Sequence, residues 1–213
     1  MENAVIDLLE FKKFPLEYQN YFRQETDLIR NNIYGKVLDI GCGNVRVLPH
    51  IYNQCQKYIG IDIDENIVKS QQKIIKNNYP DAEIKMVNAK SLAKYFNANE
   101  VDISLCLWNT LHLIGDENQI LNNISNITKD KIIITLVAKN NKSFEARKNY
   151  YNSFGIEHSI DKQSQTFYSK VWGESKAYTL SDLDNLSKES KIPLIKKGKI
   201  GYIGIYGIFQ SRR

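Results

Sequence analysis

The chain has 213 residues, of which 42% are hydrophobic and 25% are charged, and its formal net charge is +5. These values are typical of a soluble globular protein of one domain with a core of its own. No run approaches the roughly 18 apolar residues of a membrane span, and the acidic start at 1–7 is unlike a signal peptide. We therefore expect a cytoplasmic protein with no membrane partner.

The basic residues are interspersed with Asp and Glu, apart from a small Lys group at 196–199. This pattern favours a solvated surface over a nucleic-acid partner. The three cysteines, Cys42, Cys55 and Cys106, fit no metal-binding spacing. Their odd number and scatter indicate reduced thiols, and we expect no metal site.

The first predicted element is a helix within 14–31, which places Tyr18, Tyr21 and other apolar residues on one face. It precedes the first strand. It is interpreted either as a plain cover helix or as a helix over a ligand cleft, where Tyr18 and Tyr21 would contact the ligand. The residues leave both possibilities open.

A glycine loop follows the first predicted strand at 36–40 and leads into a predicted helix at 46–56. Strand, glycine-rich turn and helix form the opening of a doubly wound α/β domain, where ligands bind at the carboxyl ends of the strands. Gly41 and Gly43 permit positive φ and a close approach of the ligand to the backbone.

The residues around this loop narrow the choice of ligand. A dinucleotide fingerprint would need a third glycine where Arg46 stands, and the Gly-Lys-Ser/Thr of a P-loop is absent. Asp39 would repel a pyrophosphate but suits an ammonium or sulfonium group. Asp62 ends the next strand, 57–62, about twenty residues past the glycines, where an acid binds ribose hydroxyls. The pattern describes an adenosine-type ligand with a positive end, which is S-adenosylmethionine.

Helices and strands then alternate, which predicts a parallel sheet; the expected ranges are helix 64–78, strand 82–88, a short helix at 90–97, strand 101–107, helix 116–128 and strand 131–137. After Val137 the rhythm changes. Residues 141–153 look helical, whereas 154–178 show no helical period and contain a strand-like run at 165–172, which indicates an inserted hairpin or lid. A helix beginning at Thr179 and two strands at 192–198 and 202–209 close the chain.

These elements predict a Rossmann-like doubly wound α/β fold with a mostly parallel seven-stranded sheet and helices on both faces. The lid-like insertion lies between the fifth strand and the last helix. We expect a single domain whose parts are an N-terminal helical cap (1–34), a cofactor-binding core (35–140), the insertion (141–178) and the closing helix and strands (179–213).

The chain resembles the class I S-adenosylmethionine-dependent methyltransferases over nearly its whole length, most strongly from Gly35 to Val137. The family has an acid two residues before Gly-x-Gly, which stands here as Asp39-Ile40-Gly41-Cys42-Gly43. Val45 stands where many members have a third glycine. The closing helix and two strands are also similar to the family's last third.

The resemblance implies roles for individual residues toward the cofactor. Asp39 and the loop Gly41-Cys42-Gly43 would bind the methionine end, Asp62 the ribose, and Ile63 would lie against the adenine. Asn88-Ala89 takes the place of the family's Asp-Ala at the adenine edge. Leu107, at the end of the fourth strand, is also expected to contact the cofactor.

Candidate acceptor-site residues lie in the loop after that strand and in the insertion. His112 is a candidate general base near neutral pH, or else a surface or packing histidine. Trp108 and Asn109 are expected to shape the acceptor pocket. Aromatic residues of the insertion suggest a small or partly apolar acceptor: Tyr150, Tyr151, Tyr168 and Trp172.

Two other functions compete with a small-molecule methyltransferase. The first is a methyltransferase that acts on a nucleic acid or a protein. Enzymes that methylate base or glutamine amide nitrogens typically carry an Asn/Asp-Pro-Pro-aromatic motif after the fourth strand, where this chain has Leu107-Trp108-Asn109-Thr110. A non-catalytic protein that kept the fold and the cofactor is the other. We predict a small-molecule acceptor and an insertion folded over the cleft, with the oligomeric state left open.

Overall fold

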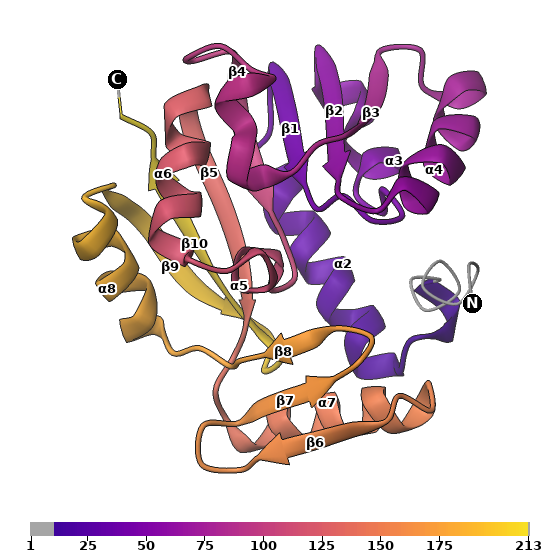
Figure 1. The fold of residues 1–213 in the computed structure, drawn as a ribbon, viewed down its shortest axis with the longest axis vertical. Coiled ribbons are helices and arrows are strands. Elements are labelled where there is room, and N and C mark those ends of the chain that lie inside the picture. Colours follow the sequence, from indigo (N-terminus) through magenta and orange to yellow (C-terminus); the bar gives the residue numbers. More distant parts are fainter. Residues whose placement is uncertain (1–10, 213) are drawn as a thin grey trace.

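The computed structural model describes residues 11–212, so the acidic segment at 1–7 lies outside the described residues. Its main sheet has seven strands in the order β3-β2-β1-β4-β5-β10-β9 (Figure 1). All neighbouring pairs are parallel except those of β10, which runs antiparallel to β5 and β9. The expected fold class is confirmed. The strands are β1 (Lys36–Ile40), β2 (Lys57–Asp62), β3 (Ala82–Met86), β4 (Val101–Cys106), β5 (Thr128–Val137), β9 (Leu194–Ile200) and β10 (Gly204–Gln210).

Helices cover both faces of this sheet because the central strands are apolar on both sides. In β1, Val37 faces one core cluster while Leu38 and Ile40 face the other, as the alternation of a strand requires. The helices and 3₁₀ turns are η1 (Phe11–Lys13), α2 (Leu16–Arg30), α3 (Leu48–Ile51), η2 (Tyr52–Gln54), α4 (Glu65–Asn78), η3 (Ala89–Lys94), α5 (Thr110–Ile114), α6 (Glu117–Ile127), α7 (Asn141–Ser153) and α8 (Leu180–Ser190).

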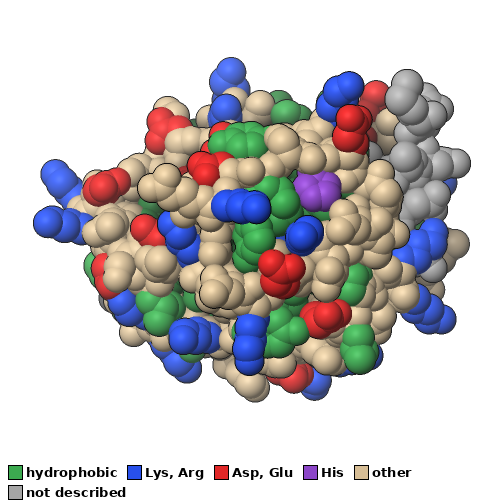
Figure 2. All heavy atoms as spheres, turned by 90° about the horizontal axis from the view of Figure 1, so that it is seen from below, with side chains coloured by type: hydrophobic (Ala, Val, Ile, Leu, Met, Phe, Trp, Pro, Cys, Tyr) green, Lys and Arg blue, Asp and Glu red, His purple; other side chains and the backbone are tan. Residues whose placement is uncertain are grey.

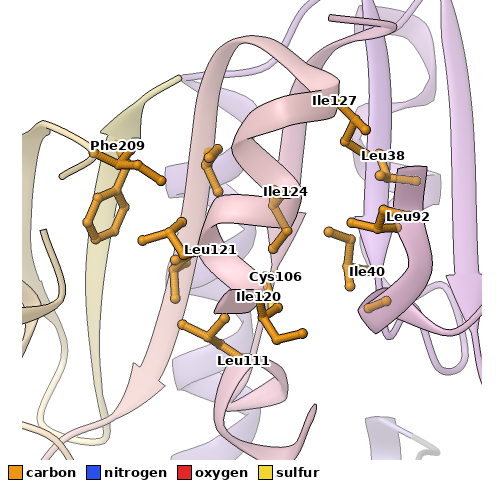
Figure 3. Packing of buried hydrophobic residues seen from close by; sticks show 14 of the residues in the cluster. Leu38, Ile40, Leu92, Cys106, Leu111, Ile120, Leu121, Ile124, Ile127 and Phe209 are labelled. Atoms are coloured by element: carbon orange, nitrogen blue, oxygen red, sulfur yellow. The ribbon is translucent and has the colours of Figure 1, made fainter. Parts of the chain in front are cut away.

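One face of the sheet packs against α6, α8 and η3, and the other against α2, α3 and α4. Figure 3 shows part of the first of these layers, in which Ile120 and Ile124 of α6 belong to one cluster with Leu38 and Ile40 of β1 and Leu92 of η3. Both isoleucines are fully buried. The two layers hold the strands so that the loops after β1, β2 and β4 meet at one edge.

The insertion consists of α7 and a small antiparallel sheet at the end of the main sheet where its parallel strands terminate (Figure 1). Its strands are β6 (His158–Asp161), β7 (Thr166–Ser169) and β8 (Gly173–Ser175). The two ends of the insertion are paired. Tyr178 N donates to Val137 O at 2.8 Å, and Lys139 N donates to Tyr178 O at 2.7 Å.

Several predicted boundaries are wrong. The helix expected at 46–56 is only α3 and the turn η2, since Val45 in the left-handed region delays its start. The segment expected as a helix at 90–97 is the 3₁₀ element η3. Of the strand-like run at 165–172, only 166–169 forms a strand, β7, and 170–172 is the turn that leads to β8. With β6, the expected hairpin is a three-stranded sheet.

No helix within residues 11–212 is long and apolar enough to cross a membrane. Over the same range, His, Cys, Asp and Glu side chains form no group of three or more that could hold a metal ion. All three cysteines are free, and Cys42 and Cys106 are buried.

Candidate active site

A cavity of about 590 Å³, the large cavity, lies between the loops at the carboxyl ends of β1–β4 and the insertion. Seven of the eleven residues expected at the cofactor line it, namely Tyr18, Gly41, Gly43, Asp62, Ile63, Asn88 and Ala89. Five of the six residues expected at the acceptor line it as well, namely Trp108, Asn109, Tyr150, Tyr151 and Trp172. The fold thus brings together loops that are far apart in the sequence.

A second, smaller cavity of about 60 Å³ adjoins it and shares the lining residues Gly41, Gly43, Trp108 and Thr110. The remaining lining residues of this small cavity include three of the expected cofactor contacts, namely Asp39, Cys42 and Leu107. The glycine loop therefore contributes to the wall of both spaces.

Asp39 is 3% exposed at the end of β1, where the Tyr58 hydroxyl donates to its Oδ2 at 2.7 Å. Burial raises the pKa of Asp39 to about 6, and the hydrogen bond from Tyr58 and the charge of Arg46 oppose that rise. The ordinary pKa of this carboxyl is 3.8, so the rise means that its ionised form is disfavoured in the folded protein. A positive group placed beside Asp39 would stabilise that ionised form.

Asp62 ends β2 and lines the large cavity. Gly43 N donates to its Oδ2 at 3.1 Å, and Asp64 N donates to its Oδ1 at 3.0 Å. Burial raises the pKa of Asp62, and these backbone N–H groups oppose the rise. The carboxylate is thereby fixed in orientation next to the glycine loop.

Every second residue of the glycine loop, from Gly41 to Val45, has a positive φ. Gly41 and Gly43 have φ of +66° and +51°, and Val45 has φ of +50°. A β-branched residue such as Val45 rarely takes this conformation. A Cβ on Gly41 would lie 2.5 Å from Thr110 Cγ2, so the β4 loop also requires a glycine here.

The loop after β4 contains two consecutive residues with positive φ, Trp108 at +46° and Asn109 at +66°. Asn109 is 4% exposed, accepts from Val137 N at 3.0 Å and donates to Lys176 O at 3.0 Å. It therefore ties this loop to β5 and to the insertion. Strained backbone of this kind is common at ligand sites.

Helix α2 is anchored to the site by a buried carboxylate. Glu25 is fully buried and pairs with Arg46, which follows the glycine loop. Tyr21 donates its hydroxyl to Glu25 Oε1 at 2.8 Å, and Thr135 of β5 donates to the same oxygen. Tyr21 also packs on Gly204, where a Cβ would lie 2.3 Å from its ring. Tyr21 lines neither cavity, whereas Tyr18 lines the large one.

His112 and Tyr168 also lie outside both cavities. The His112 Nδ1 lies 2.7 Å from the Tyr178 hydroxyl and 3.0 Å from Glu117 Oε1, and its Nε2 lies 3.9 Å from Glu174 Oε1. Tyr168 is 43% exposed on β7. In this arrangement His112 joins α5, α6 and the end of the insertion rather than facing the cofactor loops.

Other residues of the site were not singled out in the sequence: Arg46, Thr110, Arg147, Val171 and Ser175. Of the two arginines in this group, Arg147 is the more deeply buried, since it is 2% exposed and the Arg46 side chain is 18% exposed. A signal for it was present, since Tyr150 and Tyr151 follow it by three and four residues and so share its helical face.

The sheet order, the acids after β1 and β2 and the glycine loop together define a class I methyltransferase fold of the Rossmann-like type. The chain matches the family described as "Methyltransferase domain" over residues 34–190 and belongs to it. Family and fold identify an S-adenosylmethionine-dependent methyltransferase, which confirms the expected enzyme class and cofactor. No curated protein matches the chain significantly.

Solved structures share the fold at low sequence identity. A SAM-dependent methyltransferase from Aquifex aeolicus is 14% identical with a TM-score of 0.69, and the match covers 96% of this chain and 98% of that one. The 1,6-didemethyltoxoflavin-N1-methyltransferase of Burkholderia thailandensis, solved with its substrate and S-adenosylhomocysteine, is 10% identical with a TM-score of 0.63, covering 92% and 77%. The magnesium protoporphyrin IX methyltransferase of Synechocystis, solved with SAM, is 12% identical with a TM-score of 0.60, covering 92% and 82%.

Proposed function

We propose that this methyltransferase transfers the methyl group to a small molecule that binds in the large cavity. The observation that carries the proposal is the shared lining of that cavity, in which Asp62 and the glycine loop lie on one side and Tyr151 and Trp172 on the other. Its volume of about 590 Å³ is within the usual range of small-ligand sites, ~300–1,000 Å³.

The residues present fit the cofactor at both of its ends. Arg46 and Asp39 both line the small cavity, and within the described part of the chain the buried Arg46 Nη1 has no hydrogen-bond partner. A cation and an acid side by side complement the carboxylate and the ammonium of a methionine moiety. Asp62 would accept hydrogen bonds from the ribose, and Ile63 and Ala89 would contact the adenine.

When bound, the cofactor would supply an activated methyl group on a positively charged sulfur. The chain's own residues contribute position and exclusion of water. Trp108 and Asn109, fixed by their contacts with β5, orient the acceptor side of the cavity. Tyr18 of α2 and Tyr151 of α7 close the space against solvent.

Two further observations support a small acceptor. On the face seen in Figure 2, at the end where the small sheet lies, Lys and Arg side chains are interspersed with Asp and Glu rather than gathered into a basic patch. Two similar structures belong to enzymes named for small acceptors, 1,6-didemethyltoxoflavin and magnesium protoporphyrin IX. A nucleic-acid acceptor would favour a continuous basic surface.

Cofactor binding is tested by calorimetry with S-adenosylhomocysteine on the wild type, Asp62→Ala and Asp184→Ala. Loss of the charge-assisted hydrogen bonds of Asp62 should weaken binding by about 1.5–3 kcal/mol. Asp184 is exposed on α8 and pairs only with Lys197 among the described residues, so its variant serves as the control. Equal affinity in the wild type and Asp62→Ala would remove Asp62 from the site.

The acceptor class is tested by incubating the protein with methyl-labelled cofactor and either a small-metabolite extract or its protein and RNA fractions. Label transferred to molecules that pass a small-pore filter supports the proposal. Label confined to protein or RNA contradicts it.

A further inference from the structure

Arg147 is a buried cation beside the large cavity. It lies on α7, is 2% exposed, and its guanidinium carbon lies 4.3 Å from the centre of the Phe167 ring. Its Nη1 donates to Ser175 O at 3.0 Å and to Ser175 Oγ at 3.4 Å, and its Nη2 donates to Gln165 O. All of these partners are uncharged.

A buried charge is normally paired with an opposite one, because its desolvation is otherwise costly. Among residues 11–212, no ion pair involves Arg147. Its nearest titratable neighbours are tyrosines. Burial raises the pKa of both Tyr18 and Tyr151, and the Arg147 charge opposes the rise without reversing it, so both hydroxyls stay neutral.

Among residues 11–212, three buried polar atoms here make no hydrogen bond of normal geometry, namely Arg147 Nε, Tyr150 OH and Trp172 Nε1, although the Trp172 indole lies near enough to the Tyr150 hydroxyl to oppose the rise in its pKa. Arg147, Tyr150 and Trp172 all line the large cavity. Tyr150 is 3% exposed. Each can donate a hydrogen bond, and a buried donor left without an acceptor costs about 1–3 kcal/mol. Three such donors on one wall of a ligand cavity are explained by a ligand that accepts from them.

We infer that the acceptor carries a carboxylate, which Arg147 binds together with the Tyr150 hydroxyl and the Trp172 indole N–H. The inference rests on the proposed small-molecule function and specifies its substrate class. Of the five N–H groups of Arg147, two on Nη1 and one on Nη2 are engaged by Ser175 and Gln165, so the Nε–H, one N–H of Nη2 and two neutral donors remain around a single positive charge. This set suits a monoanion with two oxygens rather than a doubly charged phosphate.

The other lining residues of the large cavity indicate the polarity of the rest of the acceptor. Trp108, Leu113 and Val171 line the cavity with apolar surface. An acid with an aromatic or aliphatic body would bury that body against these side chains while its carboxylate pairs with Arg147. The negative charge would also offset the positive charge of a sulfonium in the same cavity.

The test uses pairs of probes that share a shape and differ in charge: benzoate with benzamide, and indole-3-acetate with indole-3-acetamide. Calorimetry on the protein saturated with S-adenosylhomocysteine should give each acid an affinity at least about tenfold above its amide. Arg147→Met should bring the acid to the level of the amide while the amide is unchanged. Lys148→Met removes a charge from the exposed side of the same helix and should retain the preference.

Tyr150→Phe keeps the packing and removes one donor, and Trp172→Phe keeps an aromatic ring and removes the indole N–H, so both test the site even if Arg147→Met fails to fold. Each should reduce the ratio of acid to amide affinity several-fold, which a purely structural role would not do. Equal affinity of acids and amides, or binding of neither, overturns the inference, as does tighter binding of phenyl phosphate than of benzoate.

The outcomes separate this inference from the proposed function. If S-adenosylhomocysteine binds and the acids show no preference, the inference alone fails. If S-adenosylhomocysteine does not bind, the proposed function fails, and the acid and amide probes are then compared on the free protein to decide the role of Arg147.

Discussion

Asp39→Asn should make the free protein more stable near neutral pH while weakening its binding of cofactor. Burial raises the pKa of Asp39 from 3.8 to about 6. That rise disfavours the ionised carboxylate in the folded protein by about 3 kcal/mol. Asparagine removes the charge but keeps a side-chain oxygen that accepts from the Tyr58 hydroxyl, which lies 2.7 Å from Asp39 Oδ2.

The sign of the pH dependence follows from the raised pKa. Well below pH 3.8 the carboxyl is protonated in both the folded and the unfolded state, so wild type and variant should have similar free energies of unfolding. As the pH rises toward about 6, the unfolded chain loses its proton first, and the wild type loses stability that the variant keeps. At higher pH the difference should be constant, at most about 3 kcal/mol.

Urea denaturation of both proteins without cofactor, from about pH 4.5 to pH 8, measures this difference. Calorimetry with S-adenosylhomocysteine at pH 7.5 should in turn show at least about tenfold weaker binding by the variant, because the ammonium group loses its carboxylate. A difference in stability that does not change with pH, or a variant less stable than the wild type at pH 7.5, would refute the reasoning.

Gly41→Ala should lower the free energy of unfolding by about 1–3 kcal/mol, because its Cβ meets Thr110 and its φ is +66°; urea denaturation measures it, and wild-type stability would contradict the clash. Glu25→Gln should cost about 3 kcal/mol by leaving Arg46 without its carboxylate, measured in the same way. Thr179→Ala removes the capping box of α8 and should cost about 1 kcal/mol, an effect that Ser at this position should largely restore.

Much of the fold could be predicted because the strands combine β-branched runs with clear turn signals. The ranges predicted for β1 and β2 match the structure, since each is an apolar run that ends in an acid or a glycine loop. Helix α5 was not predicted because five residues carry too little periodicity. The start of β5 at Thr128 was missed because Thr128-Lys129-Asp130 is polar, and its pairing with β4 is irregular there.

The cofactor side of the site was easier to predict than the acceptor side. Asp39, the two glycines and Asp62 lie within a short stretch of local pattern, so spacing alone places them together. The surroundings of His112 and Arg147 depend on how the insertion returns to the sheet, which no local pattern encodes. Tyr178 reaches the His112 imidazole across 66 residues of sequence, and Ser175 reaches Arg147 across 28.

Because the two ends of the insertion are paired, the core with its cofactor site and the choice of acceptor should be able to change independently. Because Val137 and Tyr178 are joined by a backbone hydrogen bond, the segment between them is a closed excursion from the sheet. Changes of length inside it leave the register of β5 and the start of α8 unaltered. A chimaera that keeps these two residues and exchanges the segment between them should retain the core and its cofactor, while its choice of acceptor follows the donor of the segment.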